Sequence, residues 1–433
     1  MIVKDGAAGL RRCLESVKGV VDRITIGDTG SSDETIAIAK EFGATVIDVP
    51  WHEDFAHARN LVLARAACDW VLMLDADEML GPEAAEQIPG LMMESTVAGY
   101  DVWRWNYVRD MGFRCGGEQA VANHVVIPET AMYPAYFTTF HTRLFRRDPQ
   151  IRFEHCVHET VAERMDAAKM RRKVAQFVVH HFGYVEDKKE EREKKDSLYY
   201  KLALQKAERY KDNYQANLEA GMSELDYAKR PRAALPYFKA AIEIAPRRAA
   251  AWLYRGICMT RLGRPAEALQ YLNSAAALEP TMMLAQSSLG DAQLQTGNYA
   301  KAREAYQKAL KLGDVSALSC AKLGAAEVHL GMTEAGMEKI EQSVAQNPES
   351  GELYDIWATS AFLAGRQGTA CAAAERRLSM ENVTGFNYFL AATLNLHANL
   401  RQKAEAILKA GLSRFPDDAD MGKMMASLNV AAA

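Results

Sequence analysis

Short apolar runs alternate with amphipathic stretches in the first part of the chain. This pattern predicts three strands and two helices, in the order 20–26, 35–42, 44–49, 54–67 and 70–74. Ser32-Asp33-Glu34-Thr35 offers hydroxyl and carboxylate groups that can cap the first helix. Alternating strands and helices give right-handed crossovers and a mainly parallel sheet. We therefore predict an α/β domain, Rossmann-like in its layers, over residues 1–187.

A second pattern, a period of 34 residues, begins near residue 215 and runs almost to the end of the chain. The residues that keep the period are Pro246, Pro280, Pro348 and Pro416, then Gly263, Gly297, Gly331 and Gly365, and Ala268, Ala302, Ala370 and Ala404. Small residues at fixed places with a closing proline are typical of tetratricopeptide repeats, which are pairs of helices. We predict six repeats over 214–418, forming an all-α superhelix, and a capping helix over 419–433.

The segment between the two patterns, 188–213, is highly charged and carries a modest apolar face. That composition predicts a helical linker whose charges are solvated. The repeats themselves point to a protein or peptide partner on their concave face, because stacked helix pairs build an extended binding surface. The alternative role for such an array is spacing or dimerisation, which would give a homodimer.

Composition excludes several classes of protein. The net charge of −4 over 433 residues implies neither a nucleic acid nor an anionic membrane as partner. No apolar run reaches the roughly 18 residues that span a bilayer, and the first residues do not resemble a signal peptide. The seven cysteines are scattered and form no Cys-x-x-Cys pair, which favours reduced thiols over a disulfide framework. We therefore expect a cytoplasmic protein.

The strongest chemical signal is Asp75-Ala76-Asp77-Glu78, directly after the apolar run 70–74. Two carboxylates one residue apart at the end of a strand suit a hard divalent cation such as Mg²⁺ or Mn²⁺. Side-chain alternation would point both carboxylates the same way. Asp28 falls at the end of another predicted strand, and the carboxyl ends of parallel strands meet at one edge of a sheet. We expect Asp28 and the Asp75/Asp77 pair to share a cleft.

Four motifs follow one another at suitable separations in the first 80 residues. They are Met1-Ile2-Val3-Lys4, Ile26-Gly27-Asp28-Thr29-Gly30-Ser31-Ser32-Asp33-Glu34-Thr35, Trp51-His52-Glu53-Asp54-Phe55-Ala56-His57-Ala58-Arg59-Asn60, and Trp70-Val71-Leu72-Met73-Leu74-Asp75-Ala76-Asp77-Glu78. Together they resemble a family 2 glycosyltransferase of the GT-A fold, in the subgroup of the sublancin-type peptide S-glycosyltransferases. The resemblance covers residues 1 to about 200 and, loosely, the repeats.

The resemblance implies a nucleotide-sugar donor, usually a UDP-sugar, a divalent metal, and transfer with inversion. In the matching positions, Asp28 would face the base or ribose, and Arg59 would lie near the base or diphosphate. Asp75 would contact the ribose, while Asp77 would coordinate the metal on the diphosphate. Physical chemistry agrees, because a cation and an arginine stabilise the charge that develops on a leaving diphosphate.

Val3 and Asp33 complete the set expected to line the donor pocket. The start of the chain departs from the family pattern, since Asp5-Gly6 follows Lys4 where relatives have Asn-Glu. The missing glutamate removes one possible donor contact, and the resulting hypothesis is a lowered affinity for the nucleotide. The turn at Asp28 also has a local interpretation, in which the carboxylate caps its own backbone.

An inverting transfer needs one general base to take the acceptor proton. Glu159, in a block that resembles the family's second motif, is the first candidate; Asp110, Glu118 and Glu154 are alternatives. Glu159 could instead orient His158 or pair with Arg143 or Arg146.

The family resemblance also implies that a late histidine completes the metal shell. His181, which follows the apolar strand 174–179, is the candidate, with His180 and His158 behind it. A neutral imidazole ligand favours Mn²⁺ over Mg²⁺.

Trp103, Trp105 and Tyr107 lie at period two on a further predicted strand, 100–108. They either pack in the core or stack on a sugar.

The sequence therefore predicts an inverting, metal-dependent glycosyltransferase acting on a protein or peptide. A second class is a scaffold built on the repeats, with a degenerate transferase domain. A third class is a dinucleotide-dependent oxidoreductase. The sequence argues against it, because the chain lacks the Gly-x-Gly-x-x-Gly phosphate turn of that class.

Overall fold

The computed structural model describes residues 1–109, 113–115, 118–125, 127–186 and 189–430. Its contacts divide the chain into two compact units, Met1–Ala245 and Pro246–Ala433. Each unit is described by itself.

A three-stranded parallel sheet opens the first unit, in the order β1-β2-β3. Its elements are β1 (Ile2–Val3), α1 (Ala7–Ser16), β2 (Thr25–Asp28), α2 (Thr35–Glu41), β3 (Thr45–Asp48) and α3 (Phe55–Arg65). The strand predicted at 20–26 is displaced, because the chain still turns at Gly19, where φ is +79°. Helix α1 was not expected from the pattern, although Leu10, Cys13 and Leu14 are buried at helical spacing.

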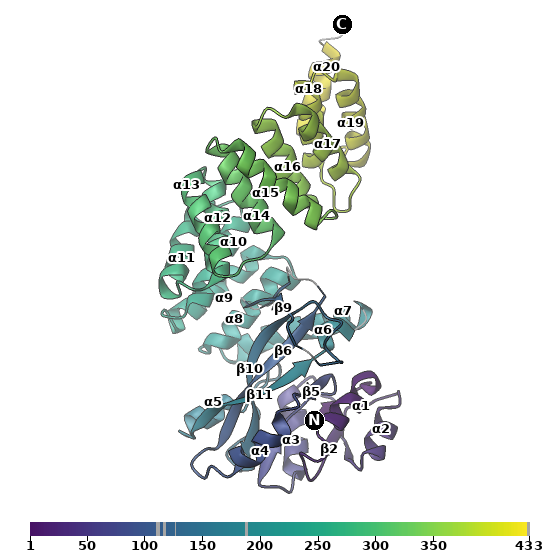
Figure 1. The fold of residues 1–433 in the computed structure, drawn as a ribbon, viewed down its shortest axis with the longest axis vertical. Helices are drawn as coiled ribbons and strands as arrows, with labels where there is room; N and C mark the ends of the chain where they lie inside the picture. Colours follow the sequence, from purple (N-terminus) through teal and green to yellow (C-terminus); the bar gives the residue numbers. More distant parts are fainter. Residues whose placement is uncertain (110–112, 116–117, 126, 187–188, 431–433) are drawn as a thin grey trace. The chain divides into compact units, whose positions relative to one another are not determined.

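A larger mixed sheet follows, in the order β4-β10-β6-β11-β5, with β9 beside β10 (Figure 1). Its strands are β4 (Trp70–Leu72), β5 (Glu78–Leu80), β6 (Gly99–Val108), β9 (Val121–Ala122), β10 (Ala135–Arg146) and β11 (Arg172–His181). Only β6 and β11 pair in parallel here. The other ladders are antiparallel. The α/β class is confirmed, but the parallel order is confined to β1–β3 and to β6–β11.

Shorter elements surround this sheet. They are α4 (Ala84–Met92), β7 (Arg114–Cys115), β8 (Glu118–Gln119), α5 (Ala162–Ala167) and α6 (Gly183–Glu186). One hydrophobic cluster joins α1 and α4 to the strands through Cys13, Ile88, Tyr100, Val102 and Phe177. This cluster fixes the sheet against the helices and so positions the loop between β4 and β5.

The aromatic side chains of β6 divide between core and surface. Tyr107 is fully buried, whereas Trp103 is 43% exposed. Trp105 stacks on Tyr136 with ring centroids 4.6 Å apart. Core packing therefore accounts for Tyr107, and Trp103 remains open to solvent.

His180, on the same face of the mixed sheet as Tyr107, gives a testable pH dependence. Burial lowers the pKa of His180 from 6.5 to about 4, although Glu83 and Glu129 act to raise it. The unfolded chain therefore takes up a proton as the pH falls below about 6.5, while the folded chain does not until about pH 4. The contribution of His180 to the free energy of unfolding is therefore constant above about pH 6.5. Between about pH 6.5 and pH 4 it falls, by about 3 kcal/mol in all.

The measurement is the urea unfolding midpoint of wild type and His180→Asn between pH 7 and pH 4. Asparagine does not titrate and keeps an acceptor for the Tyr107 hydroxyl, which lies 2.8 Å from His180 Nδ1. The variant is expected to lose less stability on acidification. Parallel pH curves for the two proteins would contradict the assignment.

Helix α7 (Lys189–Arg209) occupies the predicted linker and packs closely within the first unit. Lys206 is 1% exposed, yet its ammonium group reaches Glu219 at 2.9 Å and the carbonyl of Val157 at 3.2 Å. A buried lysine with one carboxylate partner is costly to separate from that partner. Glu219 lies in α8 (Tyr214–Met222), so the first repeat helix belongs structurally with the first unit.

Paired helices make up the remainder of the chain (Figure 1). After α8 come η1 (Ser223–Tyr227), α9 (Pro231–Ile244), α10 (Ala249–Arg261), α11 (Pro265–Leu278), α12 (Met283–Gln295), α13 (Tyr299–Lys311), α14 (Ala317–His329), α15 (Thr333–Gln346), α16 (Gly351–Leu363), α17 (Gln367–Leu378), α18 (Gly385–His397), α19 (Arg401–Arg414) and α20 (Ala419–Val430). The all-α repeat prediction is confirmed. Residues 431–433 of the predicted capping helix lie outside the described residues.

The periodic glycines serve two different purposes. A Cβ on Gly290 would meet the Tyr306 ring at 2.8 Å, and one on Gly256 would meet Leu272 at 2.6 Å, so these positions let paired helices touch. Gly263 and Gly297 instead have open space around them and φ of +71° and +76°, which turns the chain between helices. Asn399 takes the same turn at φ +62°.

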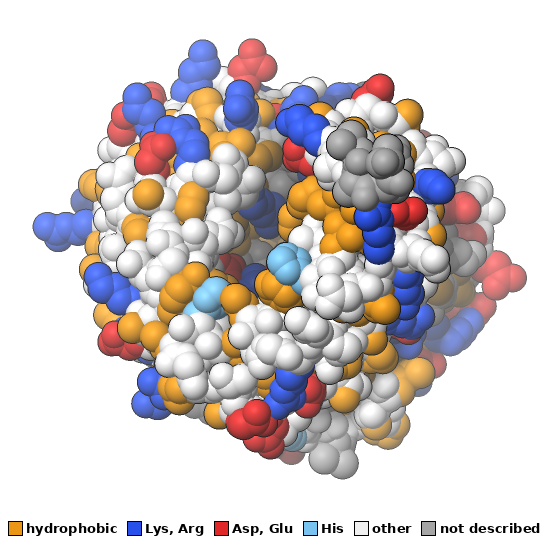
Figure 2. Space-filling model, turned by 90° about the horizontal axis from the view of Figure 1, so that it is seen from above, with side chains coloured by type: hydrophobic (Ala, Val, Ile, Leu, Met, Phe, Trp, Pro, Cys, Tyr) orange, Lys and Arg blue, Asp and Glu red, His pale blue; other side chains and the backbone are white. Residues whose placement is uncertain are grey.

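Charge on the surface is mixed. On the face of the molecule shown in Figure 2, lysine and arginine side chains are interspersed with acidic ones. In the described part of the chain, no helix is both long and apolar enough to cross a membrane.

Candidate functional site

Asp75 and Asp77 lie in the loop between β4 and β5, just beyond the strand that was predicted to carry them. The loop lies tightly on α1, because a Cβ added to Gly9 would come within 2.6 Å of the Ala76 carbonyl oxygen. Among the described residues, the two carboxylates form their ion pairs with different side chains. Asp75 faces Arg59 and Asp77 faces His181. The loop therefore gives the two carboxylates of the Asp-x-Asp pattern different partners.

Arg59 connects Asp75 to Glu159. Its Nη2 donates to Asp75 Oδ1 at 2.7 Å, and its Nε donates to Glu159 Oε1. Arg59 lies in helix α3. Asp54 caps the start of this helix, because its side chain accepts a hydrogen bond from the backbone N–H of His57 at 2.8 Å. Burial alone would raise the pKa of Asp75, but Arg59 and then Arg143 hold it far below its ordinary value. Asp75 is therefore a firmly ionised, poorly basic carboxylate.

A second ion pair lies beneath the first. Glu78 has no exposed surface and accepts from Arg143 Nη2 at 2.5 Å. Arg104 Nη1 reaches the same oxygen at 3.4 Å. The other oxygen of Glu78 accepts the backbone N–H of Asp75 at 2.8 Å, which fixes the β4–β5 loop. Burial raises the pKa of Glu78 despite the arginines.

Asp77 is the carboxylate that faces an imidazole. His181 Nε2 lies 3.4 Å from Asp77 Oδ2, and the two side chains are 12% and 32% exposed. A Cβ on Gly183 would come within 2.6 Å of Asp77 Oδ2 and 2.9 Å of His181 Nε2, so glycine keeps this space open. Burial would raise the pKa of Asp77, but the interaction with His181 lowers it.

This pair fits a divalent cation. Ligand distances of about 2.1 Å at right angles put two adjacent donors about 3 Å apart, close to the separation of Asp77 and His181. His181 Nδ1 is buried and has no hydrogen-bond partner among the described residues, so none of them fixes the tautomer of the ring. Among the described residues no group of three or more His, Cys, Asp or Glu forms a complete cage. Further ligands would come from a substrate or water, as is usual for Mg²⁺ and Mn²⁺.

Asp28, Asp33 and Val3 lie together around the ends of β1 and β2. The carboxylate of Asp28 is buried and accepts the backbone N–H groups of Gly30 at 3.2 Å and Ser31 at 3.1 Å. The carboxylate of Asp28 therefore does cap its own turn, as the local interpretation predicts. Val3 accepts through its carbonyl from Thr29 N–H at 2.9 Å. Asp33 accepts from the backbone of Ala7 at 3.0 Å, and hydrogen bonds from Thr35 help to lower its pKa against the effect of burial.

Asp5-Gly6 also has a structural role. Asp5 adopts φ +49° and accepts the N–H of Ser32 at 2.7 Å. A Cβ on Gly6 would come within 2.6 Å of the Val3 side chain and 3.0 Å of Ala76. A glutamate at position 6 would therefore disturb the loop, and the lowered donor affinity stays a hypothesis.

The loop after β10 carries the other predicted acids and histidines. Glu159 lies at the site against Arg59, whereas Glu154 faces Arg164 at 3.7 Å on the surface. His155 is buried and its Nε2 lies 2.9 Å from Glu163. The ring of His158 lies 5.9 Å from that of Tyr199 in α7. His180 points away from the site to Tyr107, so it does not reach the metal pair.

Two of the alternative bases cannot be placed. Asp110 lies outside the described residues, and only the backbone of Glu118 is described, in β8. Arg146, a suggested partner of Glu159, instead donates to the carbonyls of Val97 and Glu94.

Sequence reasoning missed Arg104 and the site role of Glu78, and it offered Arg143 only as a partner of Glu159. It also missed Tyr199 and His141, which interact electrostatically with Asp75. The alternation of β6 could have suggested Arg104, which lies between two tryptophans and must face the other way. No motif near Tyr199 indicates that it lies at the site, because it belongs to the charged helix predicted as a linker.

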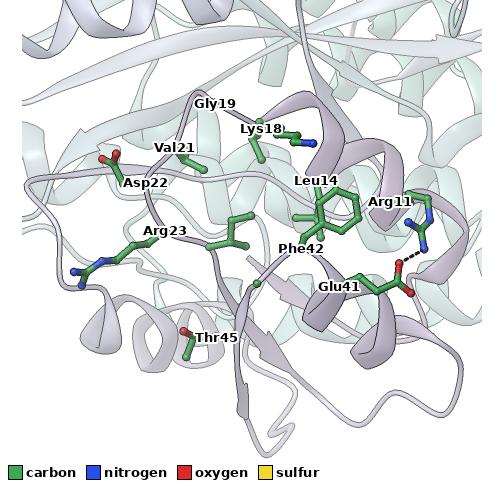
Figure 3. A pocket seen from close by; sticks show the side chains of 13 residues that line it. Arg11, Leu14, Lys18, Gly19, Val21, Asp22, Arg23, Glu41, Phe42 and Thr45 are labelled. Atoms are coloured by element: carbon green, nitrogen blue, oxygen red, sulfur yellow. Dashed lines mark hydrogen bonds and ion pairs between the residues drawn. The ribbon is translucent and has the colours of Figure 1, made fainter.

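A separate hollow lies at the opposite ends of β2 and β3 (Figure 3). Leu14, Val21 and Phe42 line it, and Arg11 pairs with Glu41 across its rim at 2.6 Å. It contains none of the predicted site residues. Ligands of α/β sheets bind at the carboxyl ends of strands, so this hollow carries no part of the site.

Comparison with known families agrees with the fold. Residues 1–152 match the model of glycosyl transferase family 2. Residues 218–282 and 261–317 match a tetratricopeptide repeat model. The first unit thus contains a family 2 glycosyltransferase domain, and tetratricopeptide repeats follow it, as the motifs and the 34-residue period predict.

Three curated relatives are similar to parts of the chain. A TPR repeat-containing protein of Synechococcus elongatus is 32% identical over 51% of this chain and 51% of its own length. An uncharacterized glycosyltransferase of Rickettsia felis is 39% identical over 20% of this chain and 31% of its own. The SPbeta prophage-derived glycosyltransferase SunS of Bacillus subtilis is 26% identical over 37% of this chain and 33% of its own. The chain thus spans about half or less of each relative.

Proposed function

We propose that the chain is an inverting, metal-dependent glycosyltransferase that moves a sugar from a nucleotide-sugar, in the first instance a UDP-sugar, to a protein or peptide. The observation that carries the proposal is the division of labour in the β4–β5 loop. Asp75 is neutralised by Arg59, while Asp77 faces His181 beside the space that Gly183 keeps open. That arrangement supplies one oxygen and one nitrogen ligand next to arginine-lined polar surface.

In this proposal Asp77 and His181 hold Mn²⁺, or Mg²⁺, and the ion neutralises the diphosphate as it leaves. Imidazole favours Mn²⁺ among hard-ligand ions. Asp28, Asp33 and Val3 form the wall for the nucleoside, with the exposed edge of Asp75 toward the ribose. Arg59 stays fixed between Asp75 and Glu159, so it meets the donor with its orientation already set. In this arrangement the first role of Glu159 is to orient Arg59, from which it accepts a hydrogen bond.

The acceptor class comes from the repeats. Tetratricopeptide arrays present extended concave surfaces to protein segments, and here the array is joined to a transferase domain. A tethered binding surface raises the local concentration of an acceptor at the catalytic unit. We therefore propose recruitment of a protein or peptide by the repeats, with the domain limits 1–187, 188–213, 214–418 and 419–433.

The alternative is a scaffold whose transferase domain no longer binds a donor. Calorimetric titration of UDP into the full chain, with Mn²⁺ and again with EDTA, separates the two. We expect binding with Mn²⁺ that weakens at least about tenfold in EDTA. If UDP, GDP and dTDP all produce no binding heat in either buffer, the result would favour the scaffold. A hydrolysis screen of UDP-, GDP- and dTDP-sugars then identifies the donor.

A further inference from the structure

The carboxylates at the site are held in ion pairs. Asp75 and Glu159 both bind Arg59, and Glu78 is wholly buried against Arg143. Asp77 faces His181 in the proposed metal position. A carboxylate oxygen that accepts hydrogen bonds from an arginine has fewer lone pairs left for the proton of an acceptor. Each of these four acids therefore already has a charged or imidazole partner among the described residues.

His141 enters the same space from the sheet. In β10, Thr139 pairs with Arg104 of β6, and the Arg104 Nε donates to the Thr139 hydroxyl at 3.1 Å. Directly paired residues share a face of an antiparallel sheet, and residues two apart along a strand do so as well. His141 therefore projects on the face of Arg104, which is the face that reaches Glu78.

The surroundings of His141 keep its ring neutral. Burial, then Arg104 and Arg143, lower its pKa well below 6.5, while Asp75 acts in the opposite direction and His158 adds to the lowering. The His141 side chain is nevertheless exposed to solvent. Neutral imidazole has one nitrogen available as an acceptor, so no proton must be lost before the ring can act.

Tyr199 of α7 and His158 lie near the same charged groups, and their rings are 5.9 Å apart. Tyr199 is 38% exposed and interacts electrostatically with Glu159, Asp75 and Asp77. Its ring also contacts Phe55 at 5.7 Å. His141 and Tyr199 therefore both interact with Asp75, and His141 also interacts with His158.

Resting on the proposed function, we propose that His141 is the general base that takes the proton from the acceptor. A ring nitrogen of His141 accepts the acceptor's proton as the acceptor heteroatom bonds to the anomeric carbon. The bond from that carbon to the diphosphate oxygen breaks, and the nucleoside diphosphate leaves with the electron pair. The imidazolium then returns its proton to water. No further reactant is required.

The test uses His141→Ala in the full chain, with water as acceptor and the UDP-sugar that wild type turns over fastest. UDP release is expected to fall about 100- to 10,000-fold, with the affinity for UDP and Mn²⁺ unchanged. Added imidazole should restore part of the rate in a saturable manner, which a structural role would not allow. His124→Ala, at an exposed position, is the matched control and should release UDP at the wild-type rate.

Several outcomes would overturn the assignment. His141→Ala with wild-type UDP release removes His141 from the reaction. Azide rescue of Glu159→Ala, without imidazole rescue of His141→Ala, transfers the role to Glu159. A wild-type chain that neither binds UDP with Mn²⁺ nor releases it from any donor overturns the proposed function itself, together with this inference.

Discussion

Replacing Asp77 with asparagine is expected to abolish metal-linked donor binding while the fold stays intact. The amide keeps the size of the carboxylate but removes the charge that faces His181, 3.4 Å away. Loss of a ligand from an ion held by two protein groups should weaken UDP binding in Mn²⁺ by more than about 100-fold. Donor hydrolysis should fall at least as far. Calorimetry with UDP and Mn²⁺ measures the first effect, and UDP release measures the second.

Asp22→Asn is the matched control, because Asp22 is exposed and lies by the hollow at the opposite ends of β2 and β3, away from the site. It should bind UDP as wild type does. His181→Ala should reproduce the Asp77→Asn phenotype. If Asp77→Asn keeps Mn²⁺-dependent binding, the metal assignment is wrong. The thermal unfolding curve guards against misfolding, since surface carboxamide substitutions usually change stability by less than about 0.5 kcal/mol.

Removing the repeats of the second unit is expected to separate donor chemistry from acceptor transfer. A chain ending at Ala245 keeps the first compact unit whole, including Glu219 against the buried Lys206. It should hydrolyse the donor at nearly the full-length rate. Transfer of labelled sugar to a native protein acceptor should fall about 100-fold or more, because the tether that raises local acceptor concentration is gone.

A chain ending at Asn213 provides the structural comparison. It removes Glu219, the carboxylate partner of Lys206, together with helix α8, which packs against α7. We expect this shorter chain to lose solubility or activity of every kind. Transfer that survives in the chain ending at Ala245 would refute recruitment by the repeats and favour a spacing or dimerisation role.

The sequence was most informative where the signal is local or periodic. The 34-residue period fixes the helix pairs, because each repeat buries its apolar face only against its neighbours. The order of the four motifs gave the domain class that the family comparison confirms. Asp75 and Asp77 were found because two carboxylates after an apolar run are a local feature, and their roles, together with those of Asp28, Arg59 and His181, stay predictions.

The sequence was least informative about pairing and partners. It did not predict that β10 joins β4 to β6, and so it could not place His141 beside Arg104. It also left open what Glu159 faces, and the structure places it against Arg59, one hundred residues away in the chain. Tyr199 and Lys206 sit in a charged helix whose composition alone suggests a solvated linker.

By itself, then, the sequence determined the two architectures and singled out Asp75 and Asp77 as candidate site residues, since both depend on spacing along the chain. Only the tertiary structure divided the Asp75/Asp77 pair, giving Asp75 to Arg59 and Asp77 to His181. The physical reason is that ion pairing depends on distances of a few ångströms between side chains brought together by strand order and helix packing. That closeness is encoded by the whole fold and by no short segment of the chain.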